Sequence, residues 1–193
     1  MSDEEKKPKA TEIMLRDVRI SFPDLFVAKS FEGQADKEPK YGAAFVVTKG
    51  SDADIKIRAR IDAVGLETFG KRWDVIRESI RLNKQKFCYL PGELKDYDGY
   101  AGNMVLSAKR NQSAGAPLIL DSNPNVVLKS GDGRPYSGCY VVAKVSIYAS
   151  TKWEGVWATL IAVQFLRHGE AFTAAGPANA DGFKEETSAD ELE

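Results

Sequence analysis

The segment Tyr140-Val141-Val142-Ala143-Lys144-Val145-Ser146-Ile147-Tyr148 carries the clearest structural signal in the sequence. Apolar residues occupy alternate positions, which is the period of a β-strand, so Val141, Ala143, Val145 and Ile147 are predicted to share one core-facing side. A second strong strand is predicted at 156–165, after a short connection around Lys152 and Gly155. The two strands together predict a hairpin.

Upstream of this hairpin, further strands are predicted at 12–20, 41–48 and 104–112, with a short extended stretch at 126–128. Pro23 is expected to end the first strand, because proline has no N–H to donate to a sheet. The glycines and aspartates of 91–102 predict an exposed loop.

Helices are predicted between the second and third long strands. Ser51 has the position of a helix N-cap, although 54–62 also alternates with the period of a strand. The cap and the alanines favour a helix, and the spacing of Trp73, Ile76 and Ile80 predicts a second helix ending near Lys84.

Five or so short strands with turn signals predict a mainly β protein that closes into a barrel, because closure removes exposed sheet edges. A five-stranded antiparallel barrel with inserted helices between the second and third strands is the oligonucleotide/oligosaccharide-binding (OB) fold. A jelly roll is the alternative, but it would require more strands.

The chain has 193 residues and 43% hydrophobic residues, which suits one globular domain. We expect a flexible arm at 1–10, the barrel domain at 11–175 and a disordered acidic tail at 176–193. The apolar run at 156–166 is too short to span a bilayer, and the polar start does not predict a signal peptide. Cys88 and Cys139 are expected to be reduced thiols in a cytoplasm.

The near-zero net charge hides an asymmetry. Residues 181–193 hold six acidic residues and one lysine, which is −5, whereas the remaining residues carry +4. Such a tail either only solubilises the protein or imitates a nucleic-acid backbone and occupies its binding site. Composition alone leaves both interpretations open.

The outward side of the 140–148 strand places Tyr140 and Tyr148 on either side of Lys144. Aromatic rings that stack on bases and cations that follow phosphates are what single-stranded nucleic acid requires, although tyrosines are also common in strands for packing reasons. The region 56–86 adds nine basic against four acidic residues, which a solvated helix face would also explain. The complete set of predicted DNA-contacting residues is Tyr140, Lys144, Tyr148, Lys109, Arg110, Lys40, Tyr41 and Trp153.

Catalytic patterns are weak. His168 is the single histidine, and no C-x-x-C, P-loop or dinucleotide motif is present, so no enzyme, metal or cofactor is predicted. One alternative is a Mg²⁺-dependent nuclease, whose loop carboxylates would be Asp96, Asp98, Asp121 and Asp132. The other alternative is a phage protein-interaction module that binds no nucleic acid.

Four segments resemble a family of phage single-stranded DNA-binding proteins once classed as a domain of unknown function, and the resemblance spans about Glu12 to Phe172. It implies an OB fold and sequence-tolerant binding of single-stranded DNA during phage replication or recombination, inside an infected bacterium. The acidic tail is also similar to those of T-odd phages, which implies replication proteins as partners, although this chain ends in Glu191-Leu192-Glu193 and not in an aromatic residue. The matching segments are Val18–Phe26, Pro39–Phe45, Tyr136–Tyr140 with the strand to Tyr148, and Val163–Glu170.

Overall fold

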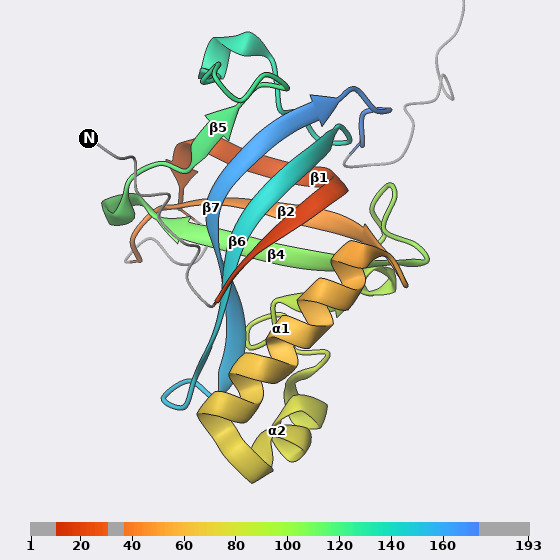
Figure 1. The fold of residues 1–193 in the computed structure, drawn as a ribbon, viewed down its shortest axis with the longest axis vertical. Coiled ribbons are helices and arrows are strands. Elements are labelled where there is room, and N and C mark those ends of the chain that lie inside the picture. The colour runs from red at the N-terminus through yellow and green to blue at the C-terminus, as the bar shows by residue number, and fades with distance from the viewer. Residues whose placement is uncertain (1–10, 31–36, 174–193) are drawn as a thin grey trace, which may run out of the picture.

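Five strands close into a barrel in the computed structural model, which describes residues 11–30 and 37–173. Four neighbouring pairs are antiparallel, and a parallel pairing of β4 with β7 at Ala108–Ala158 closes the barrel. This is the predicted OB-fold barrel, seen in Figure 1. Its strands in order around the barrel are β1 (Glu12–Lys29), β2 (Lys40–Thr48), β4 (Asn103–Asn111), β7 (Gly155–Arg167) and β6 (Tyr140–Ser150).

Two short strands extend the sheet beyond the barrel. β3 (Tyr89–Pro91) pairs with β4, and β5 (Leu118–Leu120) pairs with β7 in parallel. The stretch predicted to be extended at 126–128 lies beside β5, where Val127 forms an isolated bridge with Leu120. The short strand of this region is therefore 118–120.

The prediction that Pro23 ends the first strand is wrong, because β1 continues to Lys29. The pairing of β1 with β2 shifts register between Ser21 and Asp24, so Pro23 falls where no ladder bond is needed. The preceding residue, Phe22, has a backbone φ of +48°, which is uncommon for a bulky side chain. The irregularity therefore bends β1 without ending it.

The predicted helices are present as α1 (Asp52–Phe69) and α2 (Trp73–Ile80), joined by a 3₁₀ turn, and they precede β3 and β4. Ser51 Oγ accepts a hydrogen bond from the Asp54 N–H, which satisfies one free donor of the first turn. Trp73 is 1% exposed, and a Cβ on Gly65 would lie 2.3 Å from its ring. The glycine therefore lets the two helices pack closely around Trp73.

The carboxylate of Asp54 fixes the start of α1 to the sheet. It accepts hydrogen bonds from Gly50 N–H, Arg58 Nε and the buried Tyr89 hydroxyl, at 2.7–2.8 Å. Burial alone raises the pKa of Asp54, but these donors outweigh it and hold that pKa below its ordinary value. Asp54 is therefore a buried, ionised anchor.

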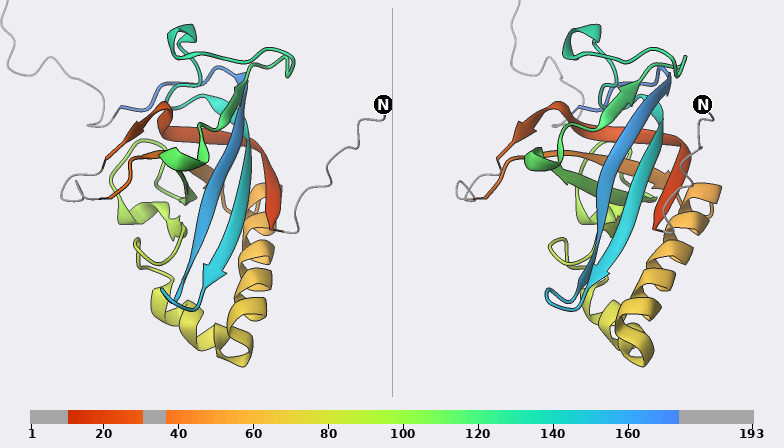
Figure 2. Two further views of the ribbon diagram at one scale, coloured as in Figure 1. Left: turned by 90° about the vertical axis from the view of Figure 1, so that its left-hand side faces the viewer. Right: turned by 60° about the vertical axis from the view of Figure 1, so that its left-hand side comes forward.

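The β6–β7 hairpin reaches beyond the barrel to the end of the molecule where the helices lie (Figures 1 and 2). The side chains predicted to face the core are 0% exposed at Val141, Ala143, Val145 and Ile147. α1 packs across β1 and β6, so the barrel interior and the helices share one core. No helix among the described residues combines the length and apolar character needed to cross a membrane.

Candidate nucleic-acid interface

The outward side of β2 and β4 carries a cluster of lysines. Ala43, Phe45 and Leu106 face the core, so Lys40 on β2 and Lys109 on β4 belong to the opposite side of their strands. Lys109 lies across from Gly42, and its side chain passes close to that glycine, which has no side chain to obstruct it. The sheet therefore brings together two of the predicted phosphate-contacting residues.

A third lysine joins them from the loop after β3. Partial burial lowers the pKa of Lys109, and repulsion from the positive charges of Lys40 and Lys95 lowers it further. Lys40 and Lys95 therefore carry charges close enough for Lys109 to experience their repulsion. We call Lys40, Lys95 and Lys109 the lysine cluster. A bound phosphate would relieve the repulsion among them.

Aromatic rings lie directly beside the lysine cluster. The Lys95 Nζ is 5.5 Å from the centroid of the Tyr97 ring, and Tyr97 makes an edge contact with Phe22 at a centroid distance of 4.9 Å. Tyr97 also contacts Tyr100, which is buried against Val46 and Val105 on the outward side of β2 and β4. The loop at 91–102, predicted to be exposed, is thus held on the barrel by Tyr100.

Sequence reasoning missed Lys95, Tyr97 and Phe22. A signal was present, since two tyrosines in a loop rich in glycine and aspartate have little reason to be there unless they pack. Phe22 was hidden by the expectation that the strand ended there. These three residues add the exposed ring of Phe22, the half-buried ring of Tyr97 and a third lysine to Lys40 and Lys109.

Strands β2 and β4 are the second and third strands of the barrel, and β6–β7 is the hairpin of the last two. OB folds bind oligonucleotides on the surface of strands two and three and with the loops that flank it. The lysine cluster lies on that surface, and Trp153 lies in the turn of the hairpin. The geometry therefore selects this side of the barrel as the candidate interface.

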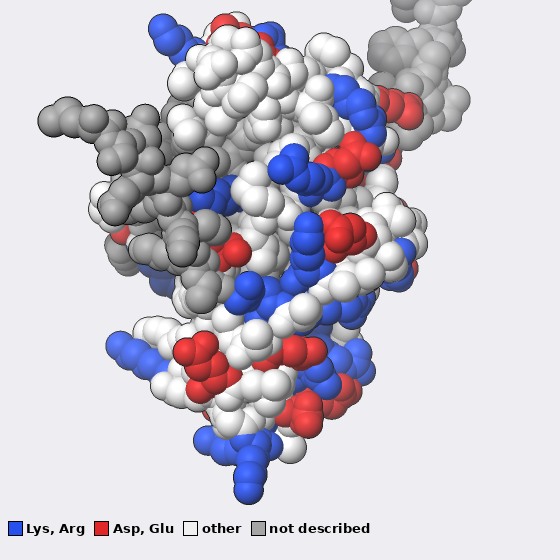
Figure 3. Space-filling view, viewed as in Figure 1, with Lys and Arg blue, Asp and Glu red and all other residues white. Residues whose placement is uncertain are grey.

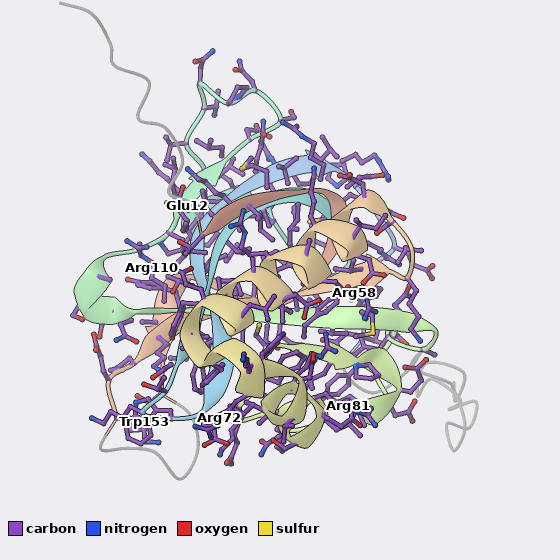
Figure 4. All side chains as sticks on the ribbon, turned by 60° about the horizontal axis from the view of Figure 1, so that its bottom comes forward. Glu12, Arg58, Arg72, Arg81, Arg110 and Trp153 are labelled. Carbon is purple, nitrogen blue, oxygen red and sulfur yellow. The ribbon has the colours of Figure 1, made fainter. Side chains whose placement is uncertain are left out.

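Trp153 is 63% exposed, and the Lys152 Nζ lies 4.9 Å from its ring centroid. Figure 4 shows Trp153 at the end of the molecule where Arg72 also lies. The Val156 N–H donates to the Lys86 carbonyl and the Cys88 N–H donates to the Val156 carbonyl, which attaches the segment after α2 beside the turn of the hairpin. An exposed ring with a cation above it is suited to stacking on a base.

The other predicted contacts on β4 and β2 are less available. Arg110 donates from Nε to the Gly115 carbonyl and from Nη2 to the Ala114 carbonyl, each at 2.7 Å, so its guanidinium fixes a turn. It is labelled in Figure 4. Tyr41 is half-buried and lies opposite Arg110 in the β2–β4 register.

The three predicted residues of β6 share its outward side but are not brought together. Tyr140 and Tyr148 are eight residues apart, which is about 26 Å along a strand. The Arg167 guanidinium lies 3.5 Å from the Tyr140 ring centroid, and the Lys144 Nζ forms an ion pair with Glu12 at 3.0 Å. Tyr148 is 45% exposed. Of these three, Tyr148 has the most accessible ring.

Charge density alone does not mark an interface, because Lys and Arg are mixed with Asp and Glu over the side shown in Figure 3. Some of the cations on the helices have carboxylate partners. Four of the nine basic residues in 56–86 have carboxylate partners on the same helices, which fits a solvated helix face. These four are Lys56, Arg58, Arg77 and Arg81.

The carboxylates considered for a nuclease do not converge. Asp121 is paired with Arg134 at 2.6 Å, Asp132 caps the Lys129 N–H, and Asp98 accepts from Thr173. Across residues 11–30 and 37–173, no group of three His, Cys, Asp or Glu side chains is arranged to hold a metal ion.

Two segments that carried the family resemblance meet in space. The Tyr136 hydroxyl donates to the Gly169 carbonyl at 2.9 Å, and its ring stacks on His168. A Cβ on Gly138 would lie 2.1 Å from the Glu170 carbonyl oxygen. These contacts make the motifs structural, because they join the start of β6 to the end of β7.

The described chain ends at Thr173, whose N–H and hydroxyl both donate to Asp98 Oδ2. Phe172 donates its N–H to the Ser137 carbonyl, and the Arg19 guanidinium lies 4.0 Å from its ring centroid. Thr173, the last described residue, therefore lies in the part of the surface that holds Phe22 and Tyr97. The predicted arm at 1–10 and tail at 176–193 themselves lie outside the described residues.

Comparisons with known proteins agree on one group. A family model described as "Enterobacter phage Enc34, ssDNA-binding protein" matches residues 11–193. A putative protein p50 of Acyrthosiphon pisum secondary endosymbiont phage 1 is 43% identical over 184 residues, which cover 94% of this chain and 97% of that protein.

Two solved structures share the fold. The single-stranded DNA-binding protein of bacteriophage Enc34 aligns with a TM-score of 0.65 at 20% identity over 90% of each chain. The same phage protein in complex with single-stranded DNA aligns with a TM-score of 0.65 at 21% identity, over 84% of this chain and 90% of the other.

Proposed function

Because the chain belongs to the family of the single-stranded DNA-binding protein of Enterobacter phage Enc34, we propose that it binds single-stranded DNA without sequence preference through the lysine cluster and its neighbouring rings. The membership confirms the resemblance drawn from the motifs around Tyr136 and His168. The solved relatives are named as DNA-binding proteins and not as enzymes, so the nuclease alternative is not retained.

One observation supports this proposal most strongly: the outward side of β2 and β4 carries Lys40 and Lys109, and the Lys95 Nζ lies 5.5 Å from the Tyr97 ring centroid. Lysines attract the phosphate backbone of any sequence, and rings stack on any base, so neither contact selects a sequence. Of the predicted residues, we assign Lys40 and Lys109 to phosphates and Trp153 and Tyr148 to bases. Tyr41 shares the side of β2 that holds the core-facing Ala43 and Phe45, so we expect no base contact from it on the lysine cluster side. Arg110, Tyr140 and Lys144 would first have to leave their present partners, so we expect smaller contributions from them.

A fluorescence anisotropy titration with single-stranded DNA, duplex DNA and RNA in parallel tests the function. If four to six phosphates are contacted, the logarithm of affinity falls with the logarithm of salt at a slope of about −3 to −4. Recovery of intact labelled DNA after incubation with Mg²⁺ is expected of a binding protein. A slope near zero, or no binding to any nucleic acid, contradicts the proposal and favours a protein-interaction module.

We further propose that the acidic tail competes with DNA for this surface or recruits phage or host replication proteins. The support is its point of departure, since Thr173 adjoins Phe22 and Tyr97 in one pocket wall. The eight residues from Thr173 to Asp181 span at most about 29 Å, so the acidic residues can reach the lysine cluster side of the barrel. Deleting 181–193 is expected to tighten binding to oligo-dT at low salt, and unchanged or weaker binding rejects competition.

The proposed setting is DNA replication, recombination or repair of a phage in the cytoplasm of an infected bacterium. There, a sequence-tolerant protein would cover unpaired strands and protect them. Loss of phage DNA synthesis or recombination on removal of the gene from a phage is the corresponding test.

A further inference from the structure

A pocket of about 350 Å³ opens beside Tyr97, at the edge of the candidate interface. Its wall includes three aromatic rings, those of Phe22, Tyr97 and Phe172, and Pro23. Its volume lies in the range of about 300–1,000 Å³ that is typical of small-molecule sites. The pocket is therefore large enough for a planar heterocycle.

Phe22 is presented at this pocket by an unusual backbone. Strand alternation after Ile20, which is fully buried, would direct residue 22 into the core, but the φ of +48° leaves Phe22 44% exposed. A bulky residue rarely adopts this conformation, and such outliers concentrate at binding sites. This ring lies outside the core and makes an edge contact with the ring of Tyr97.

A second ring of the pocket wall, that of Phe172, is held in place by its own contacts. Phe172 is held by its N–H bond to the Ser137 carbonyl and by the Arg19 guanidinium 4.0 Å from its ring centroid. A Cβ on Gly99 would lie 2.5 Å from the Phe172 ring, so glycine at 99 makes room for it. Two fixed rings thus border the pocket from different parts of the chain.

The charges of the pocket suit an uncharged ligand. Asp24 is paired with Lys29, and Asp98 accepts from both the N–H and the hydroxyl of Thr173, which holds its pKa low and keeps it ionised. Two carboxylates against one lysine disfavour a phosphate inside. Phosphates are favoured just outside, where Lys95 lies 5.5 Å from the Tyr97 ring.

We propose that this pocket takes one unstacked base of the bound strand, stacked on Phe22, while the flanking phosphates lie on the lysine cluster. The proposal rests on the proposed function and adds a discrete base subsite to it. Rings line the pocket, the pocket carries no net positive charge, and lysines lie at its rim. With this arrangement a base can enter the pocket while the phosphates on either side of it stay on the lysines outside.

The test uses the full chain with two labelled strands of about 16 nucleotides, the upper end of the site size of one OB fold. One strand is oligo-dT, and the other is an abasic strand that keeps the phosphates but has no bases. The variants are Phe22→Leu, which keeps apolar bulk without a stacking ring, and Phe22→Tyr, which keeps the ring. Val27→Ala is the matched control, because Val27 is an exposed apolar residue of the same strand, 66% accessible.

Phe22→Leu is expected to weaken oligo-dT binding by about 5- to 150-fold, the range found for one stacked base, and to leave abasic binding and the salt slope unchanged. Phe22→Tyr and Val27→Ala should bind both strands normally. Equal losses on both strands, or no loss, overturn the base subsite. Tighter binding by Phe22→Leu also overturns it and indicates that the protein's own C-terminal segment occupies the pocket. If the unaltered chain binds neither strand, the proposed function itself fails.

Discussion

Removing Lys95 and Lys109 together tests the electrostatic part of the interface most directly. Each phosphate contact on a single strand contributes about −0.7 to the slope of log affinity against log salt. Replacing both lysines with alanine should therefore make the slope shallower by about 1.4. When salt is raised fourfold, from 50 to 200 mM, the affinity of both proteins falls. The factor by which it falls should be about 7 times smaller for the variant than for the unaltered protein.

The matched control removes the same charge elsewhere. Lys56 pairs with Asp52 and Arg81 with Glu78 on the outer sides of the helices, so Lys56→Ala with Arg81→Ala also subtracts two positive charges. Anisotropy titrations of both double variants across a salt series give the slopes. Equal slopes for the two variants would show that the protein acts through its overall charge, and the assignment of phosphates to the lysine cluster would be refuted.

Other predictions concern pH and stability. Because the pKa of Lys109 is lowered, its charge is lost at a lower pH than that of an ordinary lysine, so affinity for DNA should fall early on the alkaline side, and Lys109→Arg should remove that early fall. Gly138→Ala should destabilise the fold by about 1–3 kcal/mol in urea unfolding, since φ is +105° and the Glu170 carbonyl blocks a Cβ. Asp54→Ala should cost about 1–3 kcal/mol by leaving the buried Tyr89 hydroxyl unpaired. The pKa of Asp54 is lower in the folded than in the unfolded protein. Its contribution to the free energy of unfolding is therefore complete above the unfolded-state pKa and is lost as pH falls through the folded-state pKa. The unaltered and Asp54→Ala proteins should accordingly become equally stable in acid.

The sequence predicted the barrel because the strongest signals reflect burial. A closed barrel has one interior, so the alternation from Val141 to Ile147 could only point inward on one side, and those side chains are fully buried. The cap at Ser51 similarly marked a helix start, because its side chain satisfies a donor that no other group reaches. Periodicity and capping are local, and they were sufficient for the fold.

The interface was only partly predictable, because it depends on the place where side chains of a strand stop alternating between the inward and outward sides. The register shift between Ser21 and Asp24 turns Phe22 outward, and no periodic rule indicates which residue of a bulge changes side. Lys95 and Tyr97 reach the barrel only because Tyr100 buries itself in a loop that appeared exposed by composition. Arg110, in contrast, looked like a binding cation, but the turn after β4 uses its donors.

The motifs around Tyr136 and His168 indicated the family, but their residues are not among the proposed DNA contacts. The structure explains why, because these motifs hold the barrel strands together. Their glycines allow the two backbones to touch, and the contact positions Ser137, whose carbonyl fixes Phe172 in the pocket wall. The same fixation holds Thr173, the last described residue, next to the rings of Phe22 and Tyr97. A substitution such as Gly138→Ala should therefore change the response of DNA binding to deletion of 181–193 even in molecules that remain folded, because it displaces the segment that links the tail to the pocket. If tail deletion has the same effect on affinity in both backgrounds, the tail acts without help from this anchor.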